Sequence, residues 1–291
     1  MSFDPRMPRQ LGVVGLGLMG ASLARAVRAR SPRTRIVAVE PREEVRARAL
    51  ADGVADEATA TPDAALSGCD LTVVCTPVAV IEATLAPVSR LLADGAVLTD
   101  VGGAKERVVQ LARTEVRAGV HFVGAHPMFG GHGGYGGARA DLWMGGSVAI
   151  CTDGDPDAVA RVAGLHEALG GSPVLCTAAE HDAAVAMVSH LPYLLASALA
   201  AATEAAGPLA RRLAGPGLRD TTRLAAFPFD IQGEVARRNA HIPAAAVKLE
   251  IQLQRILAAV TASPEAAREA LEAARLARES IFPAAGPGEK R

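Results

Sequence analysis

The residues from Leu11 to about Thr177 alternate between short β-branched runs and Ala- and Arg-rich stretches of helical length. Strands that alternate with helices are typical of a doubly wound, largely parallel sheet. After Ala178 no further β-branched run appears, and the chain reads as helices broken at Gly and Pro positions. The sequence therefore predicts an α/β domain over residues 1–177 and an all-α domain over residues 178–291. The predicted strands lie in the runs LGVV, RIVAVE, LTVVCTP, AVLTDVG, HFVGAHP, GSVAICT and PVLC.

Charge and aromatic content exclude several classes of partner. Thirty Lys and Arg residues balance 31 Asp and Glu residues, and no basic stripe is visible, so no nucleic-acid partner is expected. One Trp, two Tyr and six Phe offer few surfaces on which bases could stack. The longest apolar stretch, residues 191–202, is shorter than the roughly 20 residues of a membrane span. We therefore expect neither a membrane segment nor, from the polar first ten residues, a secretory signal.

The cysteines show no C-x-x-C pair and no His at metal-ligand spacing, and three of them lie in apolar runs. We expect inert, reduced thiols, no metal site and a cytoplasmic location. The four cysteines are Cys69, Cys75, Cys151 and Cys176.

The segment GLGLMG, residues 15–20, follows the first predicted strand and opens a helix, which is the setting of the dinucleotide-binding fingerprint. Its glycines let the backbone approach a pyrophosphate, and the helix N-terminus faces the negative charge. The α/β domain is therefore predicted to be of the Rossmann type. The predicted cofactor contacts in this turn are Gly15, Gly17, Leu18, Met19 and Gly20.

Glu40 ends the second predicted strand, twenty residues after Gly20. A carboxylate at this place can accept hydrogen bonds from both ribose hydroxyls of the adenosine, and it would repel a 2′-phosphate. NAD is therefore favoured over NADP. Arg42 weakens this preference because it could swing toward a phosphate, although it is equally interpreted as a solvated helix-start residue.

Two further strand ends are predicted to line the crevice that holds the nicotinamide half of the cofactor. Thr76, Pro77 and Val101 are the candidate contacts there, with ordinary strand-to-helix turns as the alternative. Lys105 follows at the start of a helix, where it is either a functional ammonium or a solvated first-turn charge, and we favour the second interpretation.

His126 lies in the segment GAHPMFG, after a predicted strand and before a proline. This places its imidazole on the same rim, over the nicotinamide crevice. A base with a pKa near neutrality is useful at that point. We therefore predict that His126 is catalytic.

Five segments resemble the prephenate/arogenate dehydrogenase (TyrA) family over nearly the whole chain: VGLGLMG, DVGGAK, GAHPMFG, EHDAAVAMVSHLPYLLASAL from Glu180, and GPGLRDTTR ending at Arg223. The last two lie in the predicted helical domain, where generic dinucleotide-binding proteins have nothing similar. The resemblance implies NAD- or NADP-dependent oxidation and decarboxylation of a cyclohexadiene diacid by a homodimer joined through the helical domains. It also implies that His126 is the catalytic histidine, His190 a substrate-site histidine and Arg223 the arginine that binds a substrate carboxylate.

Helix geometry bears separately on the two histidines of the predicted helical domain. His181 and His190 are nine residues apart, about half a turn out of phase on an ideal helix. Both can face one pocket only if Pro192 distorts the helix. We choose His190, with a satisfied core histidine as the alternative.

Arg219 and Arg223 are four residues apart and are predicted to be neighbours on one helical face. Two guanidinium groups could meet the carboxylates of a diacid through paired hydrogen bonds. For Arg219, pairing with Asp220 and solvent is the alternative.

Two departures from the family pattern concern the substrate. Gly103 stands where many members have Ser, and Gly131-His132 where many have a Thr-Glu pair. We place Gly103 and His132 in the substrate pocket and infer that it lacks a hydroxyl and a carboxylate. Gly103 is expected to offer only backbone and open space there. Prephenate, giving 4-hydroxyphenylpyruvate in aromatic amino acid biosynthesis, is the first expected substrate. The amino analogue 4-amino-4-deoxyprephenate, from specialised metabolism, is second and arogenate third; a non-catalytic NAD-binding sensor or scaffold is the alternative of a different class.

The predicted helical domain also carries a broad apolar stripe, which needs cover. Packing within one subunit and a dimer interface are both open interpretations. Further along, Ser263-Pro264-Glu265 is typical of a helix start, and the last helix is predicted to run to about Ser280. The stripe consists of Leu249, Leu253, Ile256 and Val260, widened by Val247 and Ile251.

Overall fold

The computed structural model describes residues 4–131 and 133–283. Contacts within the chain divide it into two compact units, Met1–Ala240 and His241–Arg291. Each unit is described by itself. The predicted domain boundary between residues 177 and 178 is a different division, and it stays a prediction.

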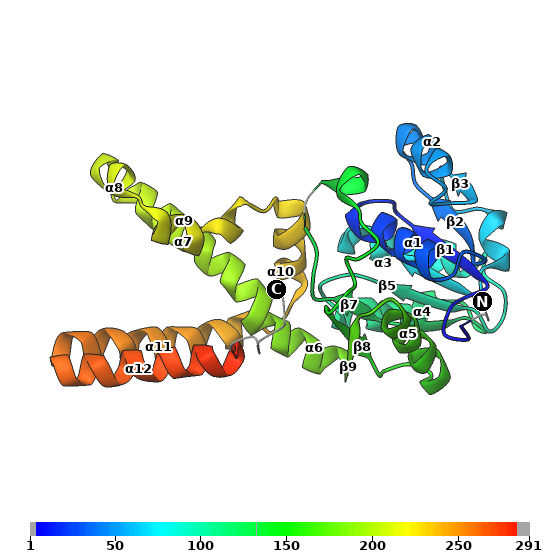
Figure 1. Cartoon of the computed structure of the whole chain (residues 1–291). Helices are drawn as coiled ribbons and strands as arrows, with labels where there is room; N and C mark the ends of the chain where they lie inside the picture. Colours follow the sequence, from blue (N-terminus) through cyan, green and yellow to red (C-terminus); the bar gives the residue numbers. More distant parts are fainter. Residues whose placement is uncertain (1–3, 132, 284–291) are drawn as a thin grey trace. The chain divides into compact units, whose positions relative to one another are not determined.

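The first unit is built on a six-stranded sheet in the order β3-β2-β1-β4-β5-β6 (Figure 1). Every neighbouring pair of these strands is parallel. This is the strand order of the dinucleotide-binding fold, and it reverses between β1 and β4, where ligands bind at the carboxyl ends of the strands. The predicted doubly wound fold is thereby confirmed. The strands are β1 (Gln10–Val14), β2 (Arg35–Val39), β3 (Glu57–Thr59), β4 (Leu71–Val74), β5 (Val97–Asp100) and β6 (His121–Val123).

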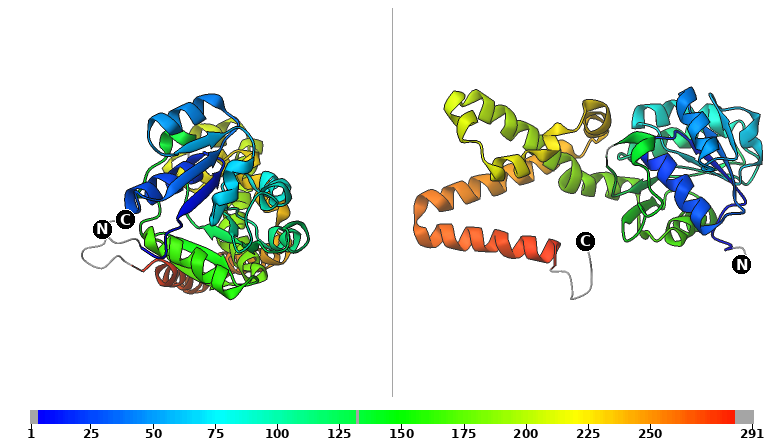
Figure 2. Two further views of the ribbon diagram at one scale, coloured as in Figure 1. Left: turned by 90° about the vertical axis from the view of Figure 1, so that its right-hand side faces the viewer. Right: turned by 45° about the horizontal axis from the view of Figure 1, so that its top comes forward.

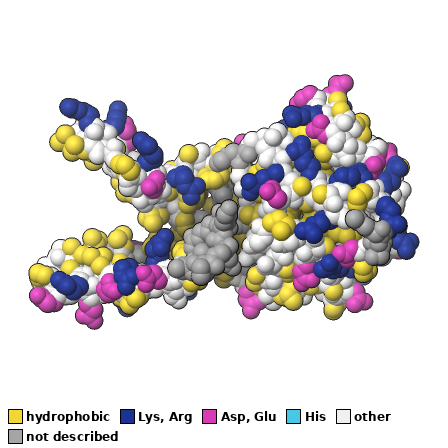
Figure 3. Space-filling view, viewed as in Figure 1, with side chains coloured by type: hydrophobic (Ala, Val, Ile, Leu, Met, Phe, Trp, Pro, Cys, Tyr) yellow, Lys and Arg dark blue, Asp and Glu magenta, His cyan; other side chains and the backbone are white. Residues whose placement is uncertain are grey.

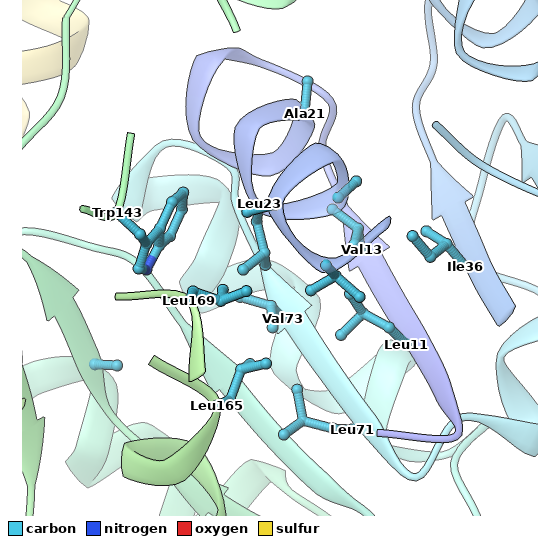
Figure 4. Close-up of a cluster of buried hydrophobic side chains, with 14 of the residues drawn as sticks. Leu11, Val13, Ala21, Leu23, Ile36, Leu71, Val73, Trp143, Leu165 and Leu169 are labelled. Atoms are coloured by element: carbon cyan, nitrogen blue, oxygen red, sulfur yellow. The ribbon is translucent and has the colours of Figure 1, made fainter. Parts of the chain in front are cut away.

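Helices cover both faces of this sheet because alternate residues of a strand point to opposite sides. Val13 of β1 belongs to the cluster packed by α1, α2 and α5, which Figure 4 shows with Leu23, Leu165 and Trp143. Val14 belongs to the cluster packed by α3 and α4 on the other face. The helical segments between residues 18 and 168 are α1 (Leu18–Arg30), α2 (Glu43–Ala51), η1 (Ala64–Gly68), α3 (Val78–Ser89), α4 (Glu106–Glu115), η2 (Gly134–Gly137) and α5 (Pro156–Ala168).

A second, three-stranded sheet contains β7 (Ala125–Pro127), β8 (Ser147–Cys151) and β9 (Ser172–Cys176), with β7 antiparallel to β8. The prediction of one strand over HFVGAHP was wrong, because the chain leaves the large sheet at Gly124 and β7 joins the small one. His126 therefore lies within a strand, opposite Ala149, and not after one. The short strand β3 was missed because its three residues, Glu-Ala-Thr, carry no apolar pattern.

The helical remainder of the first unit begins at a capping box in which Thr177 and Glu180 satisfy each other's backbone N–H groups. The helices that follow break at Gly and Pro positions, as predicted. Their bounds are α6 (Ala178–Val185), the π-helix η3 (Ala186–His190), α7 (Leu191–Ala205), α8 (Pro208–Leu213), α9 (Pro216–Thr221), the 3₁₀ helix η4 (Arg223–Ala226), the π-helix η5 (Phe229–Gly233) and α10 (Glu234–Arg238).

The run from α6 through η3 to α7 is one continuous helix of 28 residues, with a mean hydropathy of 1.6 over its most apolar window. By length and composition it is long enough to cross a membrane, so the length argument made from residues 191–202 was wrong. The helix nevertheless contains the buried polar residues His181, Asp182 and His190, whose hydrogen bonds to other parts of the unit are those of a helix packed within a protein. Only 28% of the apolar window is buried in a single chain.

The second unit is a hairpin of two helices, α11 (Ile242–Ala262) and α12 (Pro264–Ile281), which lie side by side (Figure 2). The predicted start of α12 is confirmed, because the Ser263 side chain accepts a hydrogen bond from the backbone of Ala266 at 3.1 Å. Apolar side chains on both helices reach the surface among charged ones (Figure 3). Those that are about half exposed include Val247, Ile251, Leu253, Leu257 and Val260 of α11 and Leu271 and Leu276 of α12.

Candidate functional site

The turn between β1 and α1 has the backbone that a bound pyrophosphate requires. Gly15 adopts a φ of +94°, in the left-handed region that favours glycine. A Cβ at Gly20 would overlap the carbonyl oxygen of Gly15, so close packing excludes any larger residue there. A Cβ at Gly17, by contrast, would meet nothing within 4 Å. The turn therefore leaves open space in front of the N-terminus of α1, which fits a dinucleotide phosphate.

Glu40 follows β2 and is only 2% exposed. Its carboxylate accepts hydrogen bonds from the backbone of Leu16 at 2.9 Å and from the side chain of Arg42, whose Nε lies 2.7 Å away. Burial opposes ionisation, but the bonds from Arg42 and Leu16 outweigh it and lower the pKa of Glu40. The acceptor sites that were predicted to meet the ribose hydroxyls are thus held by Arg42, which is itself half exposed.

The three predicted contacts at the neighbouring strand ends lie where the strand order reverses. The Thr76 methyl group is close to Gly15, since a Cβ on that glycine would lie 2.9 Å from it. Pro77 is exposed and precedes α3, and Val101 follows β5 and packs against the apolar cluster of α1. Their roles toward a cofactor stay predictions.

Lys105 is fully buried, so its interpretation as a solvated charge was wrong. Its ammonium group is paired with the buried carboxylate of Asp100 and donates to the carbonyl oxygen of Ala125 at 3.0 Å. Asp100 in turn accepts from the backbone N–H of Ala125. This buried ion pair therefore ties β7 to the end of β5 and fixes the backbone immediately before His126.

His126 is in hydrogen-bond contact with a second histidine. Its Nδ1 lies 2.8 Å from Nε2 of His181 on α6, and the two rings meet edge to face. His181 Nδ1 is 2.8 Å from Oδ1 of Asp182, and both of these residues are almost completely buried. Burial first, and then the repulsion that a charged His126 would meet from its neighbours His181, Lys105 and His190, lowers the pKa of His126 well below its ordinary value.

The π-helix η3 explains how two histidines nine residues apart converge on one region. Its wider turn changes the phase between α6 and α7. The distortion lies just before Pro192, whose missing N–H favours an irregular turn at that place. The stated exception, a distortion near Pro192, is therefore the case that holds, and helix geometry no longer favours His190 over His181.

His190 is 1% exposed, and protein groups surround its ring. Its Nδ1 lies 3.0 Å from the amide nitrogen of Asn239, which also donates to the carbonyl oxygen of Asp182 at 2.7 Å. The ring also hydrogen-bonds the backbone of Gly103, and burial lowers its pKa. His190 thus connects α10 to the Gly103 turn, and its contact with a substrate stays a prediction.

The space beside Gly103 is occupied by a side chain of α10. A Cβ on Gly103 would lie 2.9 Å from Cγ1 of Val235 and 3.6 Å from Cε1 of His126. The expectation that Gly103 leaves open space was therefore wrong. Val235 and the His126 ring thus both border the space beside Gly103, and Arg238 anchors the helix of Val235 to Glu82 of α3 at 3.0 Å.

The two predicted carboxylate-binding arginines do not share one helical face. Arg219 lies in the last turn of α9, whereas Arg223 begins η4 after a break at Thr222. Both are exposed, and within residues 4–131 and 133–283 neither guanidinium group has a hydrogen bond or ion pair. Leu224, next to Arg223, lines a cavity of about 160 Å³ together with Ser189, the neighbour of His190. The Arg223 segment therefore packs against the helix that carries His190.

The loop after His126 passes the dinucleotide turn. A Cβ on Gly131 would lie 3.4 Å from Leu18, and one on Gly130 would lie 4.0 Å from Met19. The predicted pocket residue His132 lies outside the described residues. Within those residues, no group of three or more His, Cys, Asp or Glu is arranged to hold a metal ion.

Comparison with known families matches almost the whole chain. Residues 23–175 match "Prephenate dehydrogenase, nucleotide-binding domain" and residues 177–273 match "Prephenate dehydrogenase, dimerization domain".

Individual relatives show the same likeness. A prephenate dehydrogenase of Bacillus subtilis (strain 168) is 31% identical over 223 residues, or 73% of this chain and 59% of that protein. The chain thus spans about three fifths of that relative's length. A cyclohexadienyl dehydrogenase of Zymomonas mobilis is 29% identical over 240 residues, which cover 80% of this chain and 81% of that enzyme. The crystal structure of Synechocystis arogenate dehydrogenase superposes with a TM-score of 0.82 at 29% identity, covering 94% of this chain and all of that one.

Proposed function

The chain belongs to the prephenate dehydrogenase family, and we propose that it uses NAD to oxidise and decarboxylate a prephenate-type cyclohexadiene diacid. The observation that carries the proposal is His126, held 2.8 Å from His181 on a strand fixed to the end of β5. The carboxyl end of β5 is where the fold presents ligands. A histidine with a lowered pKa is in its basic form there near neutral pH.

The chemistry assigned to the chain is the removal and return of one proton. Nε2 of His126 accepts the proton of the substituent on the ring carbon that loses hydride. The ring carboxyl leaves as carbon dioxide, its bonding electron pair makes the ring aromatic, and His126 returns the proton to the substituent of the product. Aromatisation makes the reaction irreversible. The cofactor, when bound, supplies the hydride acceptor, and the turn of Gly15, Gly17 and Gly20 is the element that would hold its phosphates.

The dimer is part of the proposal. The apolar side chains exposed on α11 and α12 need cover, and the matching C-terminal family is described as a dimerization domain. We therefore assign this surface to a second copy of the chain.

The four cysteines are free thiols, which supports the predicted cytoplasmic location.

The decisive test is whether the wild-type protein turns over prephenate, 4-amino-4-deoxyprephenate or arogenate. Turnover is measured as NADH formation and by analysis of the product. Turnover of any of the three supports the proposal. NAD binding without turnover of any of them would instead favour the sensor or scaffold interpretation.

We expect the specificity constant kcat/KM to be higher with NAD than with NADP, because the Glu40 carboxylate disfavours a 2′-phosphate. The Arg42 side chain has to leave Glu40 before the adenosine ribose of NAD or of NADP can bind to that carboxylate. Arg42→Ala should therefore widen the preference for NAD, and Arg48→Ala on the same helix is the matched control. Steady-state kinetics with both cofactors measure the ratio. An equal or reversed ratio in the wild type would show that Arg42 governs the site.

Prephenate is our first choice of substrate, and the amino analogue is a close second because Val235 offers no hydrogen bond next to His126. A ring hydroxyl left unpaired in a closed pocket costs about 1 to 3 kcal/mol. Gly103→Ser adds a hydroxyl there and should raise kcat/KM for prephenate relative to the amino analogue. Since its Cβ meets Val235, the double variant Gly103→Ser, Val235→Ala should show the larger change. The single variant Val235→Ala is the control.

The measurement is the ratio of the two specificity constants in each variant. If the double variant leaves the ratio unmoved, or moves it toward the amino analogue, Gly103 does not discriminate between these substrates.

A further inference from the structure

His181 and Asp182 form a buried hydrogen-bond chain behind His126. A general base can contact its substrate without such a chain. The chain runs from His126 Nδ1 to His181 Nε2 and from His181 Nδ1 to Asp182 Oδ1, each step measuring 2.8 Å. His181 is 3% exposed and Asp182 is 1% exposed. Any effect of these two side chains on the reaction is therefore transmitted through His126.

We propose that His181 and Asp182 are positioning residues that fix the tautomer of His126 and stabilise the imidazolium that it becomes. The part of this proposal that concerns turnover rests on the proposed function. The part that concerns the tautomer stands on the hydrogen-bond chain alone.

The tautomer follows from which atoms can donate. An ionised Asp182 only accepts, so the hydrogen of its bond to His181 is on Nδ1 of His181. In a neutral imidazole the other nitrogen, Nε2, is then an acceptor. The hydrogen of the His126–His181 bond is therefore on Nδ1 of His126, which leaves Nε2 of His126 as the basic nitrogen.

Asp182 is held in place by backbone groups as well as by His181. Its two oxygens accept from the backbone N–H of Lys105 at 2.8 Å and of Glu106 at 3.0 Å, at the N-terminus of α4. Although burial opposes ionisation, these bonds and the one from His181 lower the pKa of Asp182. The carboxylate is therefore a fixed negative charge at the end of the chain.

That charge has an evident use when the substrate proton arrives on Nε2 of His126. The groups that face His126 are the buried Lys105, paired with Asp100 of β5, His190 of η3, and His181 with Asp182. Lys105 opposes a second positive charge at this place. The bond from His126 to His181, backed by Asp182, is the interaction in the described site that strengthens when His126 becomes cationic.

The tautomer can be read without any substrate. The chain has seven histidines, so protein labelled with ¹⁵N-histidine gives a tractable long-range ¹H–¹⁵N spectrum, and His126→Asn assigns the His126 signals. In the wild type we expect a protonated Nδ1 and an unprotonated Nε2. His181→Leu should give a mixture of tautomers. His181→Gln, whose side-chain oxygen can still accept from Nδ1, should keep the wild-type form, as should the control His121→Gln on β6.

Kinetics provide the second measurement. His181→Leu should lower kcat about ten- to a hundred-fold, with KM and NAD affinity unchanged, because outer hydrogen-bond partners orient a reacting group without contacting substrate. Its acid limb in the pH profile of kcat/KM should move to lower pH, because the imidazolium has lost its support. His181→Gln should recover part of kcat while its acid limb stays shifted, since the glutamine no longer connects His126 to Asp182.

The outcomes separate the two proposals. An unchanged tautomer in folded His181→Leu, or an unchanged acid limb in folded His181→Leu or His181→Gln, would overturn the positioning role. If the wild type turns over none of the three cyclohexadienes, the proposed function fails, and the spectrum still decides the tautomer.

Discussion

Replacing His126 by Asn is expected to slow turnover by about a hundred- to ten-thousand-fold while NAD binding is retained, because this is the range that a positioned general base contributes. Asn keeps an amide near the position of Nδ1, so the contact to His181 can survive while the basic Nε2 is lost. Single-turnover and steady-state rates measure the effect, and a direct titration measures NAD affinity. His121→Asn on the adjacent strand β6 is the matched control.

The pH profile of the wild-type enzyme is a second test of His126 as the general base. Burial lowers the pKa of His126 well below 6.5, so the neutral, basic form persists to a lower pH than for an exposed histidine. The acid limb of kcat/KM should therefore lie below pH 6.5 and be absent from the residual activity of His126→Asn. Unchanged turnover in that variant would remove His126 from the mechanism.

The parts of the fold that the sequence could predict are those set by local backbone requirements. The left-handed φ of Gly15 and the close contact at Gly20 are properties of one turn, and the GLGLMG spacing expresses both. The Ser263 cap of α12 is local in the same way. Such features depend on a few neighbouring residues, so one sequence is enough to identify them.

The parts of the site that could not be predicted depend on partners far away in the chain. Lys105 looks like any first-turn lysine until Asp100 and the Ala125 carbonyl surround it. His181 was set aside because an ideal helix points it away from His190, and a π-helix is not visible in residue types. Its neighbour Asp182 was a signal that could have been used, because a His-Asp pair at the start of a helix is suited to orienting a second imidazole.

Arg223 was predicted from a local motif, but its proposed partner is the substrate and not another part of the described chain. The structure leaves its guanidinium exposed and gives it no hydrogen bond or ion pair within the described ranges, 4–131 and 133–283. Its 3₁₀ helix packs against the helix that carries His190, through the cavity lined by Leu224 and Ser189. A cation that pairs with none of the described residues and lies at the edge of such a site is available to a carboxylate of the substrate.

If the bound substrate buries its carboxylate against Arg223, Arg223→Ala is expected to weaken substrate binding by about 2 to 5 kcal/mol, the cost of leaving that buried carboxylate without its partner. This corresponds to about a thirty- to four-thousand-fold higher dissociation constant. Arg223→Lys should lie between the wild type and Arg223→Ala, because it keeps the charge and loses the paired hydrogen bonds. Arg219→Ala should matter less, since the break at Thr222 removes Arg219 from the helical face that both arginines were predicted to share.

The measurement is the dissociation constant of substrate or product in the presence of NAD. Small and equal effects of Arg223→Ala and Arg219→Ala would place the carboxylate site elsewhere, whereas a large effect confined to Arg223 would place it at the start of η4.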